Sequence, residues 1–125
     1  MIKKILIVDD SMLARMAVRK CLSEIPDLEI HEAADGVQGL TKFLEIHPDL
    51  TFCDLTMPNM NGFDAMRHML TASNGAMIVI LTADTQQSTS KRLTDGGALM
   101  VLHKPPRRDE ILRAYALAET RTKAG

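Results

Sequence analysis

The sequence predicts a doubly wound α/β fold of five strand–helix units, (βα)5, with a flavodoxin-like parallel sheet of strand order 2-1-3-4-5. Three observations support this prediction. Short, nearly continuous apolar runs alternate five times with segments of helical periodicity. Several runs are rich in β-branched residues, as strands buried on both faces are. Polar side chains with binding chemistry follow directly after several of these runs.

The size and composition of the chain indicate one domain, residues 1–125, with its own core. Apolar residues make up 46% and charged residues 25%, as in ordinary globular proteins. A net charge of -1 and 3% aromatic residues argue against direct nucleic-acid binding. The sequence has neither a membrane-length apolar run nor a secretory signal, so we expect a cytoplasmic protein without membrane contact.

The first two units are predicted from residues 5–46. The apolar run 5–8 is a strand, and residues 11–25 have the apolar spacing of a helix that Pro26 and Asp27 end. Residues 28–34 alternate loosely and predict the second strand. The Asp35-Gly36 turn can cap the next helix. The expected apolar stripe of that helix is Leu40, Phe43, Leu44 and Ile46.

The third and fourth strands are the runs 50–53 and 77–81. Between them, residues 55–62 have the composition of a loop, and residues 63–71 have helical spacing. The inward side chains of that helix are expected to be Met66, Met69 and Leu70.

The fourth helix, residues 85–94, is the weakest of the predicted elements. Its one large apolar residue is Leu93, and its many Ser and Thr residues lower helix propensity. Gly96-Gly97 supplies a C-terminal stop. The fifth strand follows at 99–103, and residues 108–121 predict the last helix.

The cysteines and histidines suggest no site of their own. Cys21 and Cys53 fall on apolar faces without paired spacing, which predicts buried core thiols. The four histidines have no metal-ligand spacing, and we expect no catalytic role for His103, which strand alternation points away from the face of its neighbour Lys104.

Five polar residues at strand ends form the candidate site: Asp9, Asp10, Asp54, Thr82 and Lys104. In an open α/β sheet the binding crevice lies outside the carboxyl ends of the strands, so these residues are expected to converge. Clustered carboxylates suit Mg²⁺, and a carboxylate can form an aspartyl phosphate. A lysine and a hydroxyl can hold phosphoryl oxygens. Taken singly, each residue is more often just solvated or, like Asp10 or Ser11, a helix cap.

An ordered set of motifs over residues 2–119 resembles one family. The set is Asp9-Asp10-Ser11 with Arg15, Asp54-Leu55-Thr56-Met57-Pro58 with Gly62, Thr82-Ala83, Gly97-Ala98 and Lys104-Pro105. With it, the chain is similar to the receiver domains of bacterial two-component response regulators, close to the single-domain, CheY-like chemotaxis type. The resemblance implies a phosphorelay signalling protein that takes its phosphoryl group from a sensor histidine kinase.

The resemblance also implies residue roles. Asp54 would be the phosphoacceptor, and Lys104 and Thr82 would contact the phosphoryl group. The Mg²⁺ ligands would be Asp9, Asp54 and the backbone carbonyl of Thr56, with Asp10 acting through water. The domain would catalyse its own phosphotransfer and dephosphorylation, with Thr56 and Asp84 tuning water access. The Lys104-Pro105 bond is expected to be cis.

Three departures from the family pattern fall on one surface. Val101 occupies the position of the usual Tyr or Phe, Pro106 replaces a bulky apolar residue, and the neighbouring helix is the polar one. Sequence drift on a surface that only packs is one explanation. Our alternative hypothesis is that the acceptor chemistry is intact and that the fourth helix changes its order or position on phosphorylation.

Three functions remain open. The leading one is a phosphorylation-switched module that binds a downstream target. The second is a relay intermediate that passes phosphate from Asp54 to a histidine phosphotransfer protein, and the third is an interaction domain that is not phosphorylated. We expect a monomer or weak dimer.

Overall fold

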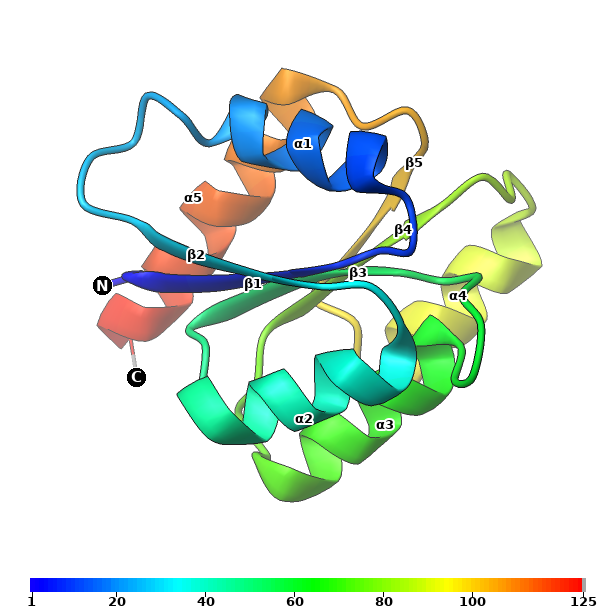
Figure 1. Ribbon diagram of the computed structural model, residues 1–125. Coiled ribbons are helices and arrows are strands. Elements are labelled where there is room, and N and C mark those ends of the chain that lie inside the picture. Colours follow the sequence, from blue (N-terminus) through cyan, green and yellow to red (C-terminus); the bar gives the residue numbers. More distant parts are fainter. Residues whose placement is uncertain (125) are drawn as a thin grey trace.

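A computed structural model describes residues 1–124 of the chain, with side chains for residues 1–122. Five strands and five helices alternate along the sequence, as predicted (Figure 1). The strands are β1 (Lys4–Val8), β2 (Glu29–Ala33), β3 (Leu50–Asp54), β4 (Ile78–Thr82) and β5 (Met100–His103). The helices are α1 (Met12–Cys21), α2 (Gly36–Ile46), α3 (Gly62–Ala72), α4 (Gln87–Asp95) and α5 (Arg108–Ala124).

The sheet is parallel and has the strand order β2-β1-β3-β4-β5, which confirms the predicted topology. Figure 1 shows α1 and α5 on one face of the sheet and α2, α3 and α4 on the other. Because all strands run the same way, their carboxyl ends lie at one edge. The register pairs Val8 with Cys53 and Thr82 with His103, which brings the ends of distant strands together there.

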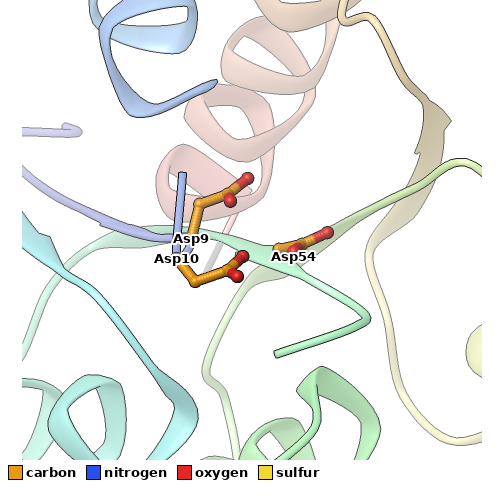
Figure 2. Close-up of side chains that lie close together, drawn as sticks. All are labelled: Asp9, Asp10 and Asp54. Carbon is orange, nitrogen blue, oxygen red and sulfur yellow. The ribbon is translucent and has the colours of Figure 1, made fainter. Parts of the chain in front are cut away.

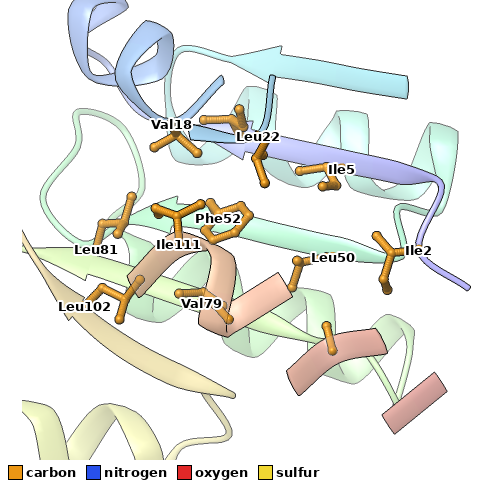
Figure 3. Packing of buried hydrophobic residues seen from close by; sticks show 13 residues of the cluster. Ile2, Ile5, Val18, Leu22, Leu50, Phe52, Val79, Leu81, Leu102 and Ile111 are labelled. Carbon is orange, nitrogen blue, oxygen red and sulfur yellow. The ribbon is translucent and has the colours of Figure 1, made fainter. Parts of the chain in front are cut away.

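The core has two layers, one on each face of the sheet. Ile5 and Ile7 of β1 pack into the cluster beneath α1 and α5, which Figure 3 shows around Phe52. Leu6 and Val8, with the opposite pleat, pack into the cluster beneath α2, α3 and α4. Every residue of β3 is buried. This two-sided burial explains why the strands read as continuous apolar runs.

Helix caps match the local sequence signals. Ser11 and Asp35 are the N-caps of α1 and α2, and their side chains accept hydrogen bonds from the N–H groups of Ala14 and Gln38. Gly62 opens α3 because a Cβ there would lie 2.1 Å from the Asp54 carbonyl oxygen. The loop after β3 therefore folds back closely on the end of that strand.

Two helix ends differ from the sequence prediction by three residues or more. Helix α1 ends at Cys21 rather than Ile25, because the Leu22 and Ser23 N–H groups bond back to Arg19 and Lys20 in a tightened final turn. Helix α5 continues to Ala124, beyond the predicted end at residue 121.

Some side-chain predictions also need correction. Leu44 was expected in the apolar stripe of α2 but is half exposed, because it faces away from the core that Phe43, the residue before it, packs into. Cys53 is buried, and desolvation raises the pKa of its thiol to about 12, as a core thiol requires. Cys21 is only partly buried, at the shortened end of α1. No helix among the described residues combines the length and apolar character needed to span a membrane.

Candidate functional site

Three carboxylates meet at the carboxyl edge of the sheet and form an acidic cluster of Asp9, Asp10 and Asp54 (Figure 2). One oxygen of each lies within 4.8 Å of the others. Asp9 and Asp54 are only 1% and 6% exposed, whereas Asp10 faces solvent. Residues 45 positions apart are thus adjacent because β1 and β3 are hydrogen-bonded neighbours.

Lys104 links the two buried carboxylates of the cluster. Its ammonium lies 2.8 Å from Asp9 Oδ2 and 3.1 Å from Asp54 Oδ1. The other oxygen of Asp9, Oδ1, accepts a hydrogen bond from the Ser11 N–H at 2.9 Å. Lys104 follows directly after β5 and is joined to Pro105 by a cis peptide bond, as predicted.

The electrostatics of the site follow from burial and proximity. Desolvation, together with the charges of Asp9 and Asp10, raises the pKa of Asp54 above its usual value, and the Lys104 ammonium opposes this rise. Burial alone lowers the pKa of Lys104, but hydrogen bonds to Asp9 and Asp54 outweigh it and raise the pKa. Lys104 therefore stays charged and partly neutralises the cluster.

The donor set of the cluster fits Mg²⁺. This ion prefers oxygen ligands and is commonly held by one or two carboxylates while it keeps several waters. The cluster offers two buried carboxylates and one exposed carboxylate on the solvent side. Thr56 lies in the loop after β3, two residues beyond Asp54, and the role of its carbonyl stays a prediction.

Thr82 connects the carboxyl edge of the sheet to the start of α4. Its buried hydroxyl accepts a hydrogen bond from the Asp84 N–H at 3.0 Å. The Asp84 carboxylate in turn accepts from the Gln86 N–H at 2.9 Å and from the Thr89 hydroxyl at 2.7 Å. These two bonds lower the pKa of Asp84, which is therefore ionised. Thr82, Asp84 and Thr89 thus form one chain of hydrogen bonds from the edge of the sheet to α4.

The position without the expected aromatic, Val101 in β5, lies next to α4. Val101 is half-buried and packs against the cluster that contains Leu93 of α4. Strand alternation places His103 on the same face as Val101, and its lack of a catalytic role stays a prediction. The buried His103 Nε2 has no hydrogen-bond partner among the described residues.

The sequence reasoning did not identify two residues that support the site. Arg15 donates a hydrogen bond from Nη1 to the backbone oxygen of Asp9, and its Nε bonds Glu32. Arg15 was singled out only as part of a motif, and Glu32 was not singled out at all. A glutamate in an edge strand has no signal of its own, because its partner lies 17 positions away.

Comparisons with known proteins show the family of the chain. Residues 5–116 match the family described as the response regulator receiver domain. The chain is 34% identical to Protein CcdB of Bacillus subtilis, over 90% of this chain and 94% of that protein. It is 31% identical to the chemotaxis protein CheY of Thermotoga maritima, over 90% and 93%. A solved receiver domain from Clostridium thermocellum superposes with a TM-score of 0.88, at 27% identity and 98% coverage of both chains.

Proposed function

This chain belongs to the response regulator receiver domain family of two-component systems, and we propose that it is a phosphorylation-switched signalling protein whose phosphoacceptor is Asp54. The observation that carries this proposal is the bridging of buried Asp9 and Asp54 by Lys104 at the carboxyl edge of the sheet. Receiver domains of this family act with histidine kinases and downstream partners. We take residues 1–125 as one such domain, cytoplasmic and monomeric or weakly dimeric.

The acceptor role of Asp54 follows from its place in the site. A carboxylate oxygen of Asp54 attacks the phosphorus of a kinase phosphohistidine, the new O–P bond forms, and the P–N bond breaks with its electron pair left on the imidazole. The Lys104 ammonium, already 3.1 Å from Asp54 Oδ1, stabilises the negative charge of the transferring group. Thr82 then bonds a phosphoryl oxygen, and water later hydrolyses the acyl phosphate.

The metal ligands in this proposal are Asp9, Asp54 and the Thr56 carbonyl, with Asp10 acting through water. Mg²⁺ bound there would neutralise charge on the carboxylates and on the phosphoryl oxygens. Lys104, which contacts both Asp9 and Asp54, is proposed to contact the phosphoryl group as well.

The kinase is proposed to dock over the start of α1. Met12, Leu13 and Met16 are 63%, 75% and 55% exposed, and they lie shortly after Asp9 and Asp10 in the chain. An exposed apolar group beside a phosphorylation site is typical of a protein contact, and methionine adapts readily to a partner surface.

Phosphorylation by a small donor tests the acceptor. The protein is incubated with acetyl phosphate and Mg²⁺, and the intact mass is measured for wild type, Asp54→Asn and Asp64→Asn. We expect one phosphoryl adduct in wild type and in Asp64→Asn, which changes an exposed carboxylate in the first turn of α3. We expect none in Asp54→Asn. An adduct that persists in Asp54→Asn would overturn the assignment. Its absence from wild type would favour an interaction domain that is not phosphorylated.

The relay intermediate is the second candidate, and Val101 favours it because a relay needs the chemistry more than an aromatic reporter. In that case phosphorylated protein transfers its group to a histidine phosphotransfer domain. Loss of the adduct from this chain with matching gain on the phosphotransfer domain would support a relay. Hydrolysis to free phosphate without transfer would exclude it for that partner.

A further inference from the structure

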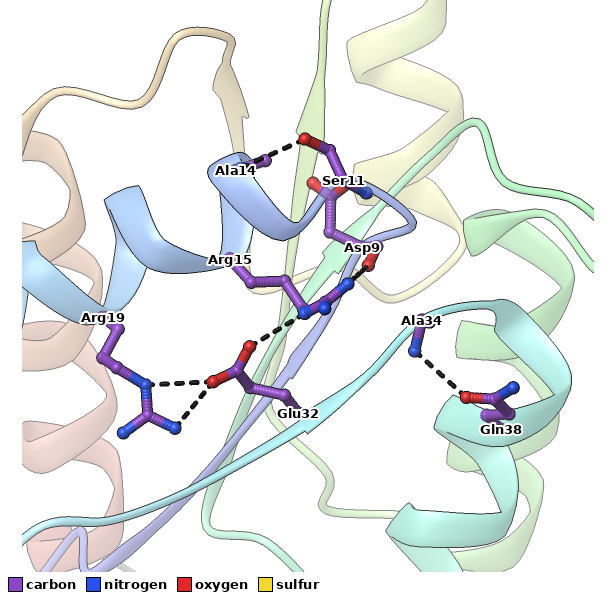
Figure 4. A network of polar contacts seen from close by, with 8 residues as sticks. All are labelled: Asp9, Ser11, Ala14, Arg15, Arg19, Glu32, Ala34 and Gln38. Carbon is purple, nitrogen blue, oxygen red and sulfur yellow. Dashed lines mark hydrogen bonds and ion pairs between the residues drawn. The ribbon is translucent and has the colours of Figure 1, made fainter.

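Three charged side chains, Arg15, Arg19 and Glu32, form a hydrogen-bonded group that contacts the backbone of Asp9, and we call this group the clamp (Figure 4). The Arg15 guanidinium of α1 donates from Nη1 to the Asp9 carbonyl oxygen at 2.6 Å and from Nε to Glu32 Oε1 at 2.8 Å. Arg19, one turn later, donates to the other oxygen of Glu32 at 2.7 and 3.0 Å. Glu32 belongs to the edge strand β2, so the clamp joins α1, β1 and β2.

The carbonyl that Arg15 holds belongs to the peptide between Asp9 and Asp10. The peptide itself is rigid, so the torsions on either side of it, ψ of Asp9 and φ of Asp10, set the direction of the Asp10 side chain relative to that of Asp9. The N–H of Asp9 is already fixed, since it donates to the Ala33 carbonyl at 3.0 Å. Arg15 fixes the other side of the residue, so the main chain of Asp9 is anchored at both ends.

The contacts of Arg15 with Asp9 and Glu32 are partly shielded from water and involve two charged groups. The Arg15 side chain is 16% exposed, and its planar fork contacts an oxygen of each of two elements. Partial burial by itself raises the pKa of Glu32, but hydrogen bonds from Arg19 and Arg15 lower it below the usual value. Glu32 is therefore ionised at neutral pH and keeps Arg15 oriented.

We propose that Arg15, held by Glu32, is a positioning residue that orients the Asp9–Asp10 peptide for Mg²⁺ binding. This inference rests on the proposed function, in which the acidic cluster binds Mg²⁺. Partners outside the ligand shell orient ligands elsewhere in proteins, and their loss typically weakens metal binding by about 10–100-fold.

The charge of Arg15, taken alone, predicts that its loss would strengthen Mg²⁺ binding rather than weaken it. Arg15 is a cation close to a cation site, and removal of a nearby positive charge favours binding of Mg²⁺. A positioning role predicts weaker binding when Arg15 is lost. A purely structural role predicts a less stable protein with unchanged Mg²⁺ affinity, so the three explanations separate in one measurement.

The test is a Mg²⁺ titration of the unphosphorylated protein, followed by the backbone amide signals of residues 9–11 in NMR spectra. We expect Arg15→Met to raise the dissociation constant about tenfold. Arg19→Met is the matched control. It also removes one positive charge and the hydrogen bonds to Glu32 Oε2, but in the described part of the chain Arg19 makes no hydrogen bond to Asp9. We expect its dissociation constant to stay within about twofold of wild type.

Each result has a defined meaning. Unchanged or tighter binding in Arg15→Met, with normal binding in wild type, would overturn the positioning role and leave the proposed function standing. No binding to wild type would overturn both. If Arg15→Met fails to fold in far-UV circular dichroism, Arg15→Lys takes its place, since lysine keeps the charge without the planar fork. Its Mg²⁺ binding is also expected to weaken.

Discussion

The acidic cluster and the α4 flank, residues 83–97, lie at the same edge of the sheet but are held very differently. In the cluster, the Asp9 carboxylate accepts hydrogen bonds from the N–H of Ser11, the N-cap of α1, and from Lys104 in the loop after β5. Lys104 also pairs with Asp54. Helix α4, in contrast, buries only Leu93 of its nine residues, and no side chain caps it at Gln86.

The remaining attachments of α4 are few and polar. The Thr89 hydroxyl bonds Asp84 at 2.7 Å, and the Arg92 guanidinium lies 4.3 Å from the centre of the Phe63 ring. Such contacts contribute little where water competes. The residues proposed for the chemistry are thus held by several elements, whereas α4 is held by few contacts, which favours the hypothesis that α4 carries the response. A rigid acceptor beside a loosely held helix suits a switch.

Replacement of Lys104 is expected to have the largest effect on this contrast. Lys104→Met removes the cation between Asp9 and Asp54, so the rate of phosphorylation by acetyl phosphate should fall by roughly 10²–10³-fold. The control is Lys91→Met, which breaks only the exposed pair with Asp95 on α4. A fall of less than about threefold in Lys104→Met would mean that Lys104 is structural rather than part of the chemistry.

Matched leucine truncations compare the two regions directly. Leu50 in β3 and Leu93 in α4 are both almost fully buried. We expect Leu50→Ala to lower the free energy of unfolding by about 3 kcal/mol, because the sheet cannot yield without global unfolding. Leu93→Ala should cost less in urea unfolding but remove amide-exchange protection across residues 87–95, because α4 detaches locally. Equal losses of unfolding free energy in the two variants, with unchanged amide exchange in α4, would contradict the difference between the two regions.

Activation is expected to change the α4 flank more than the rest of the sheet edge. Beryllofluoride with Mg²⁺ imitates the phosphoryl group, and Thr82 would leave the Asp84 N–H to bond it. We expect amide-exchange rates over residues 83–97 to change by about tenfold, in line with typical coupling energies. Unchanged protection there beside changes elsewhere would show that another element carries the response. Thr82→Val, which lacks the hydroxyl, should abolish the change.

The smallest expected effect concerns the clamp behind the cluster. The pKa of Glu32 is lowered in the folded protein from an ordinary value of 4.5, so its contribution to stability is present above pH 4.5 and lost as the pH falls through the lowered pKa. Glu32→Gln should therefore be less stable than wild type by at most about 1 kcal/mol near neutrality. Urea unfolding over an acid pH series measures whether this difference vanishes. A difference that persists at the lowest pH would contradict the ionic explanation.

Most of the fold could be predicted from the sequence, because buried strands and helix faces produce a regular spacing of apolar residues. The apolar runs that end at Val8, Cys53 and Leu81 required strands buried on both faces, and the structure has them. The end of α1 was missed by four residues, because an i to i−3 turn at Ser23 does not alter the apolar spacing. Boundaries of this kind depend on which carbonyl a single N–H reaches.

The chemical groups at the strand ends could be read from the apolar runs alone: Asp9, Asp10, Asp54, Thr82 and Lys104. Their pairing could not, because it depends on the folded chain: Lys104 contacts both Asp9 and Asp54, Thr82 bonds the Asp84 N–H, and Arg15 links the Asp9 carbonyl to Glu32. The two kinds of information differ in sequence range. Burial and periodicity are local properties that a run of residues records, whereas an ion pair between residues 95 positions apart exists only after the sheet has aligned them.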